Sequence, residues 1–322
     1  MAGPLTDEAL LHRIIGAASL APSIHNTQPW YFRVATASVL ELHADLDRVL
    51  WIADPHGRAL HLSCGAALLN LRVAIRAAGY RPLVWQRASA ASTLIASVEL
   101  VPGHPASLAE QELYAAIQRR HSSRSPFSER PLSEAASISL EQAAGFECAS
   151  LRLLSDRETA AVLRLAAAAD RELSAYPDYR GELVGWVGQP AASAVGIPAQ
   201  ALGPQPDDMP GPVRDFGVRV ASRPTAHFEQ HPQLGVLCTA RDSTQDWLRA
   251  GQALQRVLLT ATAHGLATSL LYQPVELHDM RGDAAGWWPW PEHPQIIVRF
   301  GYGPRAASTP RRPLPELLEP PR

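Results

Sequence analysis

The sequence contains no lysine, so its 29 basic residues are all arginine. Arginine in this proportion favours dispersed pairing with acidic side chains over a polycationic tail. The formal net charge is −2 and the isoelectric point is near 6.6. A protein that binds nucleic acid or an anionic membrane surface needs a clear basic excess. We therefore expect neither of these partners.

Cysteine is also scarce, and long apolar runs are missing. Cys64, Cys148 and Cys238 are widely spaced, odd in number and form no CxxC pair, which argues against a disulfide framework and a zinc site. No window approaches an uninterrupted apolar span, and the residues from Met1 to Asp7 lack the basic and apolar regions of a signal peptide. We expect an unexported, cytoplasmic protein without membrane segments.

What the sequence does contain is ample material for a core. Its 322 residues are 46% hydrophobic, enough for one large or two modest domains. Apolar periodicity, helix-start residues and Gly79 as a helix end predict alternating helices and strands. In the first part of the chain the expected helices are 7–20 and 60–78, and the expected strands are 30–34, 39–43, 83–86 and 94–101.

A rigid turn joins the first expected helix to the first expected strand. Pro22 and Pro29 each fix φ and remove a backbone donor, while Ser23, Asn26 and Gln28 crowd polar side chains between them. Amide and hydroxyl groups held in fixed directions suit the edge of a flat polar heterocycle. The alternative is an Asx-rich turn that caps its own backbone.

The second part of the chain contains a near copy of an earlier segment. One constant offset matches Gly65 to Gly251, Ala67 to Ala253, Leu68 to Leu254 and Gly79 to Gly265. Strand-like stretches follow in the same order in both places. We therefore predict a duplication, with an N-terminal half at 1–106 and a C-terminal half at 107–322.

Two arginine-rich segments occur only in the C-terminal half. Arg120, His121, Ser122 and Arg124 follow an expected helix and precede Pro126, so that guanidinium and hydroxyl donors project from a short bend. Such donors suit a terminal phosphate, although a solvated basic stretch is the alternative. The pair Arg311 and Arg312 lies between stiffening prolines, and its alternative is a charged tail.

Irregular sequence fills residues 186–215, where prolines are so frequent that they exclude a helix. A loop this long inside a compact protein is usually a lid or a linker. Both flanks belong to one half, which disfavours a linker, so we predict a lid; a surface excursion is the alternative.

The motif Pro-Ser-x-x-Asn-x-Gln-Pro-Trp, between a helix and a strand, closely resembles the signature of the FMN-dependent nitroreductase family. The rest of the chain is similar to the Acg-type branch of that family. The resemblance implies an α+β fold with mixed, mainly antiparallel sheets flanked by helices. Ordinary nitroreductases are homodimers with two FMN sites across the subunit interface. Here it implies a single-chain pseudo-dimer, meaning two halves that pair as two subunits would, monomeric and with one site.

The resemblance also implies which residues bind FMN. The turn would supply the ring-edge contacts, the RRHSSR segment and the late arginine pair would hold the phosphate, and a strand near the flavin N5 would contribute its main chain. That strand could equally be a buried connector. The expected cofactor-binding residues are Pro22, Ser23, Ile24, Asn26, Gln28, Arg120, His121, Ser122, Arg124, Leu270, Leu271, Tyr272, Arg311 and Arg312.

As an enzyme of this family, the protein would pass hydride from NAD(P)H through FMN to a nitro-aromatic or quinone-type acceptor, with no catalytic side chain and no metal. A lid that stays shut would instead make it an FMN-storing or sequestering protein, and a tailoring oxidase is a third possibility.

Three other motifs resemble functional sites, but we assign no function to them. Gly301 to Ala306 formally fits GxGxxA but contains Pro304; His227 and His231 lack a third metal ligand; the run from Gly286 to Pro291 is expected to be an aromatic brace.

Overall fold

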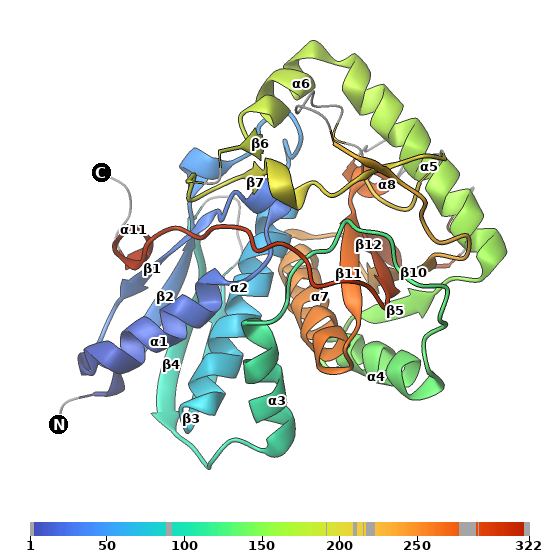
Figure 1. Cartoon of the computed structure of the whole chain (residues 1–322). Coiled ribbons are helices and arrows are strands. Elements are labelled where there is room, and N and C mark those ends of the chain that lie inside the picture. The colour runs from blue at the N-terminus through green and yellow to red at the C-terminus, as the bar shows by residue number, and fades with distance from the viewer. Residues whose placement is uncertain are drawn as a thin grey trace.

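The computed structural model describes residues 3–87, 92–190, 192–208, 211–214, 216, 223–276, 288 and 290–318. Within this part of the chain, two four-stranded antiparallel sheets lie on either side of a central helical layer (Figure 1). Parallel pairing within the described residues is limited to two short two-stranded ladders of the predicted lid segment and the residues after it, and to an isolated bridge between Ser122 and Thr268. The described helices are too short or too polar to cross a bilayer.

The helices and strands expected in the first part of the chain are present, with small shifts at their ends. The first elements are η1 (Pro4–Thr6), α1 (Glu8–Ser19), η2 (Ile24–Asn26), β1 (Trp30–Val34), β2 (Val39–Ala44), η3 (Leu46–Arg48), α2 (Arg58–Ala77), β3 (Tyr80–Gln86) and β4 (Leu94–Pro102). They are followed by α3 (Leu108–Ile117), α4 (Glu134–Gly145), β5 (Ser150–Leu153), α5 (Asp156–Ala175) and α6 (Pro177–Val184). The remaining ones are β6 (Val187–Gln189), β7 (Ile197–Pro198), η4 (Ala199–Ala201), β8 (Gln205–Pro206), β9 (Thr225–Ala226), β10 (Gln233–Thr239), α7 (Thr244–Ala263), β11 (Ala267–Leu271), α8 (Gln273–Glu276), β12 (His293–Gly301) and α11 (Leu314–Leu318).

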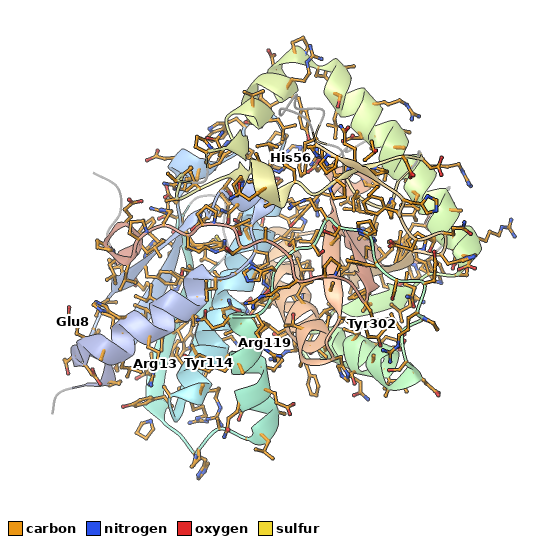
Figure 2. All side chains as sticks on the ribbon, viewed as in Figure 1. Glu8, Arg13, His56, Tyr114, Arg119 and Tyr302 are labelled. Atoms are coloured by element: carbon orange, nitrogen blue, oxygen red, sulfur yellow. The ribbon has the colours of Figure 1, made fainter. Side chains whose placement is uncertain are left out.

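Local chemistry accounts for the helix that leads into the polar turn. The Asp7 carboxylate caps α1 by accepting hydrogen bonds from the backbone N–H groups of Ala9 and Leu10 at 3.0 and 3.2 Å. The outer side of α1 carries Glu8 and Arg13, both exposed (Figure 2). Its opposite face buries apolar side chains, so the end of the helix is fixed against the core.

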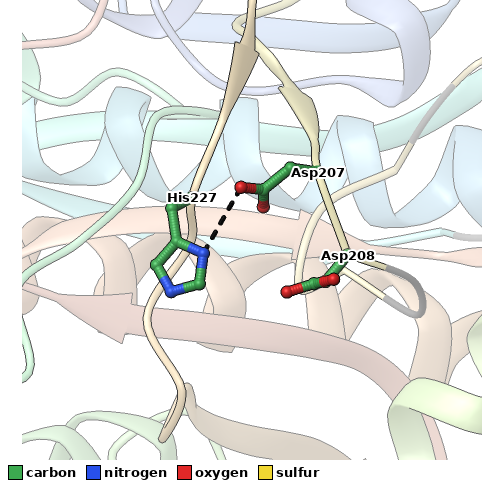
Figure 3. A group of neighbouring side chains, drawn as sticks. All are labelled: Asp207, Asp208 and His227. Atoms are coloured by element: carbon green, nitrogen blue, oxygen red, sulfur yellow. Dashed lines mark ion pairs between the residues drawn. The ribbon is translucent and has the colours of Figure 1, made fainter.

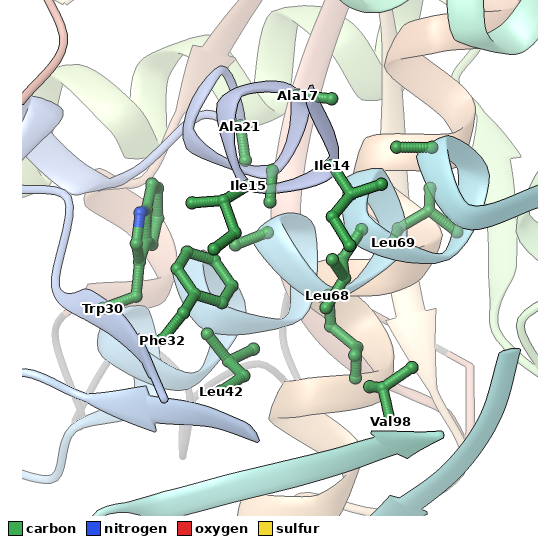
Figure 4. Close-up of a cluster of buried hydrophobic side chains, with 14 of the residues drawn as sticks. Ile14, Ile15, Ala17, Ala21, Trp30, Phe32, Leu42, Leu68, Leu69 and Val98 are labelled. Carbon is green, nitrogen blue, oxygen red and sulfur yellow. The ribbon is translucent and has the colours of Figure 1, made fainter. Parts of the chain in front are cut away.

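The N-terminal core fills the space between the first sheet and helices α1 and α2. Ile14 from α1, Phe32 and Leu42 from the sheet, and Leu68 from α2 are fully buried and point into this layer (Figure 4). Trp30, the last residue of the polar motif, is buried with them. Burial of these side chains fixes the start of β1 and therefore the far end of the turn.

The two sheets share one strand order when strands are compared by their place in each half. The N-terminal sheet runs β1-β2-β4-β3, and the C-terminal sheet runs β5-β10-β12-β11. Helices α2 and α7 have equal lengths, and their ends are related by the same offset that relates Gly65 to Gly251. This equivalence supports the predicted pseudo-dimer, while common origin of the halves stays a prediction.

Helices α2 and α7 pack directly against each other at the centre of the molecule (Figure 1). The matched glycines lie at this contact: a Cβ on Gly65 would stand 2.2 Å from the Leu248 carbonyl oxygen. A Cβ on Gly251 would stand 2.0 Å from the Leu62 carbonyl oxygen. Neither position can hold a side chain unless the helices separate. This explains why both of the matched positions are glycine.

Two elements of the later sequence pack on the N-terminal half. Ala116 and Ile117 at the end of α3 and Leu317 of α11 are buried in the N-terminal core. The chain after β12 crosses the front of the molecule to reach α11 beside β1 (Figure 1). The proposed boundary at residue 106 therefore divides the sequence, but the second half also contributes to the first core. This crossing carries the late arginine pair to the polar turn.

The predicted lid segment contains short ordered pieces rather than continuous loop. Strands β6 and β7 pair with each other, and η4 is a single 3-10 turn within the stretch expected to exclude helix. Pro198 precedes this turn, where its missing donor costs nothing. Residues 191, 209–210 and 215 of the segment lie outside the described residues.

Candidate functional site

A cavity lies where the polar turn of the N-terminal half meets the arginine-rich segments of the C-terminal half. About 650 Å³ between the protein atoms belongs to it, part of this open to solvent, but only about 60 Å³ can hold the centre of a water molecule. Ligand pockets usually measure about 300–1,000 Å³. The free space is therefore smaller than that of a usual ligand pocket.

Ten of the fourteen residues that the sequence predicted as cofactor-binding line this one cavity. They come from the turn, the RRHSSR segment, the end of β11 and the C-terminal crossing, namely Pro22, Ser23, Asn26, Arg120, His121, Ser122, Arg124, Leu270, Tyr272 and Arg311. Segments nearly 300 residues apart thus meet at one place: the Arg311 guanidinium donates to the Asn26 side-chain oxygen at 3.0 Å, across a separation of 285 residues. Their roles toward a cofactor stay predictions.

The backbone of the turn is strained, and a serine of the turn closes it. His25, Asn26 and Gln28 all have positive φ, at 46°, 57° and 51°. Such angles are rare for residues other than glycine and cluster at functional sites. The Ser23 hydroxyl accepts a hydrogen bond from the Gln28 backbone N–H at 2.9 Å and so closes the turn. Ile24 points away from the cavity and packs with Leu50 in a small apolar cluster.

The RRHSSR segment is fixed by the C-terminal sheet. Ser122 forms a parallel bridge with Thr268 of β11, and the Ser123 N–H donates to the Thr268 carbonyl oxygen at 2.7 Å. This pairing places the segment beside Leu270 and Tyr272, which line the cavity from the same strand end. Leu271 lies between them and is buried in the sheet core, because alternate residues of a strand face opposite sides.

Four arginines line the cavity, and no acidic side chain is among the described residues that line it. Arg120 and Arg214 are buried, and Arg124 and Arg311 are half-buried. Burial lowers the pKa of Arg120 to about 10. Burial and then repulsion by Arg214 and Arg223 lower the pKa of Arg124 to about 10. Burial and then repulsion by Arg120 lower the pKa of Arg311 to about 9. The cavity is therefore strongly electropositive, and an anion inside it would relieve this repulsion.

Arg120 carries the clearest sign of a missing partner. Its side chain is only 4% exposed, and one guanidinium nitrogen, Nη2, donates to the Leu20 carbonyl oxygen at 3.2 Å. Its Nε and Nη1 atoms are buried and have no hydrogen-bond partner. Buried charged donors are normally paired. Beside it, burial and then Arg120, Arg311 and Arg305 lower the pKa of His121 to about 4.

Gln28 and Arg312 were predicted to touch the cofactor, but neither lines the cavity. Gln28 accepts a hydrogen bond from the Arg312 backbone N–H at 2.8 Å and donates to the Ala194 carbonyl oxygen at 2.9 Å. The Arg312 guanidinium donates to the Trp30 carbonyl oxygen and pairs with Asp45 at 3.2 Å. Both residues thus bind the C-terminal crossing to the N-terminal half.

The predicted lid segment contributes Ile197 and Arg214 to the lining of the cavity, with Phe216 just beyond it. Two hydrogen bonds fasten it to the turn at Gly196, whose carbonyl oxygen accepts from the Asn26 amide at 3.0 Å and whose N–H donates to the Asn26 carbonyl oxygen at 3.2 Å. Arg214 forms ion pairs with Glu276 at 3.5 Å and with Asp170 at 3.4 Å. These contacts fasten the segment to the polar turn and to helices α5 and α8.

Sequence reasoning did not single out six residues that line the cavity: His25, Ile197, Arg214, Phe216, Ala307 and Thr309. His25 is one of the variable positions of the motif, so the motif gave no signal for it. Arg214 and Phe216 lie at the end of the proline-rich stretch, where no periodicity announces which side chains point inward. Their burial beside one another results from tertiary packing, and the sequence pattern does not indicate it.

A possible metal-ligating group lies elsewhere, on the surface. The short β8–β9 pairing brings Asp207 and Asp208 beside His227, with one ligand atom of each within 4.8 Å of the others (Figure 3). All three side chains are exposed, and His227 pairs with Asp207 at 3.4 Å. Glu229 points away and forms a buried ion pair with Arg299. We assign no metal to this group.

The remaining sequence motifs have structural surroundings of their own. Gly301 and Gly303 pack closely on the Phe127 ring, where an added Cβ would stand 2.6 Å from a ring carbon. In the tryptophan-rich run, Trp288 is buried and lies 4.6 Å from Trp290 between ring centroids. Residues 286, 287 and 289 of that run lie outside the described residues.

Comparison with known proteins decides the family. No family model matches the chain. The protein is 32% identical over 315 residues to the "Putative NAD(P)H nitroreductase acg" of Mycobacterium tuberculosis, covering 94% of this chain and 92% of that relative. This chain belongs to the Acg branch of the nitroreductase family. A second relative of this branch in the same organism, "Putative NAD(P)H nitroreductase Rv3131", is 32% identical over 321 residues, covering 97% of this chain and 92% of its own length.

The nitroreductase-like α+β fold expected from the sequence is thereby confirmed for this Acg-branch chain. Solved structures with some likeness include a nitroreductase with bound FMN from Bacteroides fragilis, at a TM-score of 0.38 and 11% identity over 63% of this chain and 94% of that one. Another, from Desulfitobacterium hafniense, also with bound FMN, has a TM-score of 0.39 and 15% identity over 63% and 94%. Likeness at this level carries no conclusion about the ligand of this chain.

Proposed function

We propose that this Acg-branch protein binds one FMN in the cavity and passes hydride from NAD(P)H to a small acceptor of the nitro-aromatic or quinone type. The observation that carries the proposal is the group of arginines that line the cavity with no acidic residue among the described lining residues, above all the two unpartnered nitrogens of the buried Arg120. A phosphate group answers both needs, because it is dianionic and accepts several charge-assisted hydrogen bonds.

The donor chemistry of the cavity fits the rest of FMN as well. Arg120 would hold the phosphate through its two unpartnered nitrogens, and the Ser122 hydroxyl would hydrogen-bond the ribityl chain. Arg311 would contribute its charge, since its guanidinium already donates to the Ser19 and Leu20 carbonyl oxygens. The main chain at Leu270 and Tyr272 would face the ring system. When bound, FMN supplies the hydride-accepting chemistry itself. The protein then needs only to position the ring, tune it by hydrogen bonds and exclude water, so we name no catalytic side chain.

The single site also follows from an asymmetry between the halves. At the place in the C-terminal half that corresponds to the polar turn, Glu147 follows α4 and forms ion pairs with Arg72 at 2.7 Å and with Arg256 at 2.6 Å. These groups satisfy one another and leave no counterpart of the unpartnered Arg120. We therefore propose one FMN for each chain, with the chain acting as a monomer. The cytoplasmic location expected from the sequence stays a prediction.

A second function has a specific observation in its favour. The predicted lid segment, fastened to the polar turn, and the narrow free space of the cavity are what an FMN-storing or sequestering protein would need. In such a protein the hydride donor and the acceptor could not stack on the flavin. The two functions share the same bound cofactor and differ only in whether the segment opens.

Anaerobic mixing with NADPH and with NADH separates these functions. The protein is first loaded with FMN and freed of excess flavin, and its visible absorbance is then followed after mixing. Prompt bleaching with either nucleotide supports the reductase, and subsequent recovery of colour with a quinone or a nitro-aromatic identifies the acceptor class. Persistent yellow colour with FMN still bound supports storage. A protein that retains no FMN contradicts both functions.

A further inference from the structure

The amide side chains of the polar turn are already engaged by the protein. The Asn26 amide nitrogen donates to the Gly196 and Pro310 carbonyl oxygens at 3.0 and 3.1 Å, and its oxygen accepts from Arg311. The Gln28 amide is engaged at both ends by Ala194 and Arg312. Because these groups are satisfied internally, a ligand could use them only by breaking contacts that hold the predicted lid segment and the C-terminal crossing in place.

Two side chains of the turn, His25 and Thr27, each have a buried polar atom without a hydrogen-bond partner among the described residues, and of these two His25 lines the cavity. His25 is only 6% exposed, and its unpartnered atom is the ring nitrogen Nε2. The ring meets Phe216 edge-on, with centroids 5.8 Å apart and planes at 76°, so its orientation is fixed by packing. A buried polar atom without a partner is destabilising, and such atoms in native proteins call for an explanation.

The charge state of His25 narrows the kind of ligand. Burial and then repulsion by Arg214 and Arg124 hold the pKa of His25 well below its ordinary value. The imidazole is therefore neutral at physiological pH and offers one donor and one acceptor. Nε2 can therefore donate or accept, depending on the tautomer. A neutral heterocycle edge that alternates carbonyl oxygens with an N–H group, such as the pyrimidine edge of a flavin, offers a partner for either tautomer.

We propose that His25, rather than the amides of Asn26 and Gln28, hydrogen-bonds the polar edge of the bound flavin and orients its ring. His25 then serves as a positioning residue, while the two amides are structural and hold the predicted lid segment and the C-terminal crossing against the turn. This inference rests on the proposed FMN binding, and it departs from the reading of the motif in which the amides meet the ring.

Three variants and two measurements test the assignment. His25→Phe keeps the ring and removes both nitrogens; His25→Asn tolerates the positive φ but is too short to replace the imidazole. Gln28→Met is the control, because it keeps the length of a side chain in the same turn and removes its hydrogen bonds. FMN affinity is measured by quenching of flavin fluorescence at a temperature well below all melting temperatures. Thermal melting of the flavin-free proteins is measured separately.

Both His25 variants are expected to weaken FMN binding about tenfold or more and to shift the visible absorbance band of the bound flavin. The flavin-free melting temperature of His25→Phe is expected to stay near the wild-type value, because loss of the unsatisfied Nε2 offsets the strain of phenylalanine at positive φ. His25→Asn is expected to melt lower, because it leaves empty space and a buried amide. Gln28→Met is expected to melt lower and to lose less FMN affinity than His25→Phe. If His25→Phe does not fold, His25→Asn decides alone.

Wild-type affinity and an unchanged flavin spectrum in a folded His25 variant would overturn the inference while leaving FMN binding intact. So would a larger loss of affinity in Gln28→Met than in the His25 variants. If the wild-type protein binds no FMN, the proposed function fails, and this inference fails with it.

Discussion

Arg120→Met should change two properties of the protein in opposite directions. In the flavin-free protein the Arg120 guanidinium is buried, and burial lowers its pKa from the ordinary arginine value to about 10. Since a folded pKa below the unfolded one means that folding disfavours the charged form, the charge costs stability at neutral pH. At about 1.4 kcal/mol for each pKa unit, this cost is roughly 3 kcal/mol.

Methionine keeps most of the side-chain volume and carries no charge. It loses the hydrogen bond to Leu20, worth about 1 kcal/mol. The net expectation is therefore a flavin-free protein more stable by about 1–2 kcal/mol, seen as a melting temperature a few degrees higher. In the presence of FMN the sign reverses, because each lost charge-assisted hydrogen bond to the phosphate is worth about 1.5–3 kcal/mol. With two such bonds lost, affinity should fall about a hundredfold or more.

The assay is differential scanning fluorimetry without flavin, followed by FMN titration of the same samples. Arg119→Met is the matched control, since Arg119 is the neighbouring arginine and is exposed. Among the described residues, its side chain donates a hydrogen bond to the Ala115 carbonyl oxygen of α3 at 3.4 Å. Arg119→Met should leave both properties nearly unchanged. A lower melting temperature together with unchanged FMN affinity in Arg120→Met would refute the view that Arg120 awaits an anion.

Two further predictions concern packing and pH. Gly251→Ala should destabilise the protein by about 3 kcal/mol or more, because the new Cβ would stand 2.0 Å from the Leu62 carbonyl oxygen. Gly16→Ala should instead stabilise the protein by up to about 1 kcal/mol, because Gly16 lies in a helix and no atom is within 4 Å of the new Cβ. Chemical denaturation of both variants checks this, and equal effects would contradict the packing of α2 on α7. Because the pKa of His121 is lowered to about 4 by burial and nearby arginines, the unfolded chain takes up its proton first as pH falls from about 6.5 to 4, and stability drops in that window. His121→Gln should make melting temperature less dependent on pH in this range, and an unaltered pH profile would count against this electrostatic description.

Local sequence signals were sufficient for most of the fold. Strand β1 begins and ends where alternation predicted, and α2 ends just before Gly79, whose φ of 87° suits the residue after a helix. Such features depend on neighbours in sequence, which pattern analysis reads directly. The offset match also located Gly65 and Gly251, although only the structure shows why both lack a side chain.

The site was predictable in its location and less so in its individual contacts. The motif and the arginine segments led to one cavity because they carry unusual side chains at fixed spacing. Whether Gln28 faces a ligand or the Arg312 backbone depends on where the C-terminal crossing runs, and no local pattern encodes that path. Ile24 and Leu271 were assigned by their place in a motif, but their apolar side chains have neighbours in the core.

The most direct test of the account is a calorimetric titration of the flavin-free wild-type chain with FMN and, in parallel, with riboflavin, which has the same ring but no phosphate. If buried arginines from one half and the polar turn from the other form a single anion-dependent site, FMN binds with one molecule per chain and riboflavin binds about a hundredfold more weakly. Equal affinity for the two flavins, or two FMN molecules per chain, would contradict it.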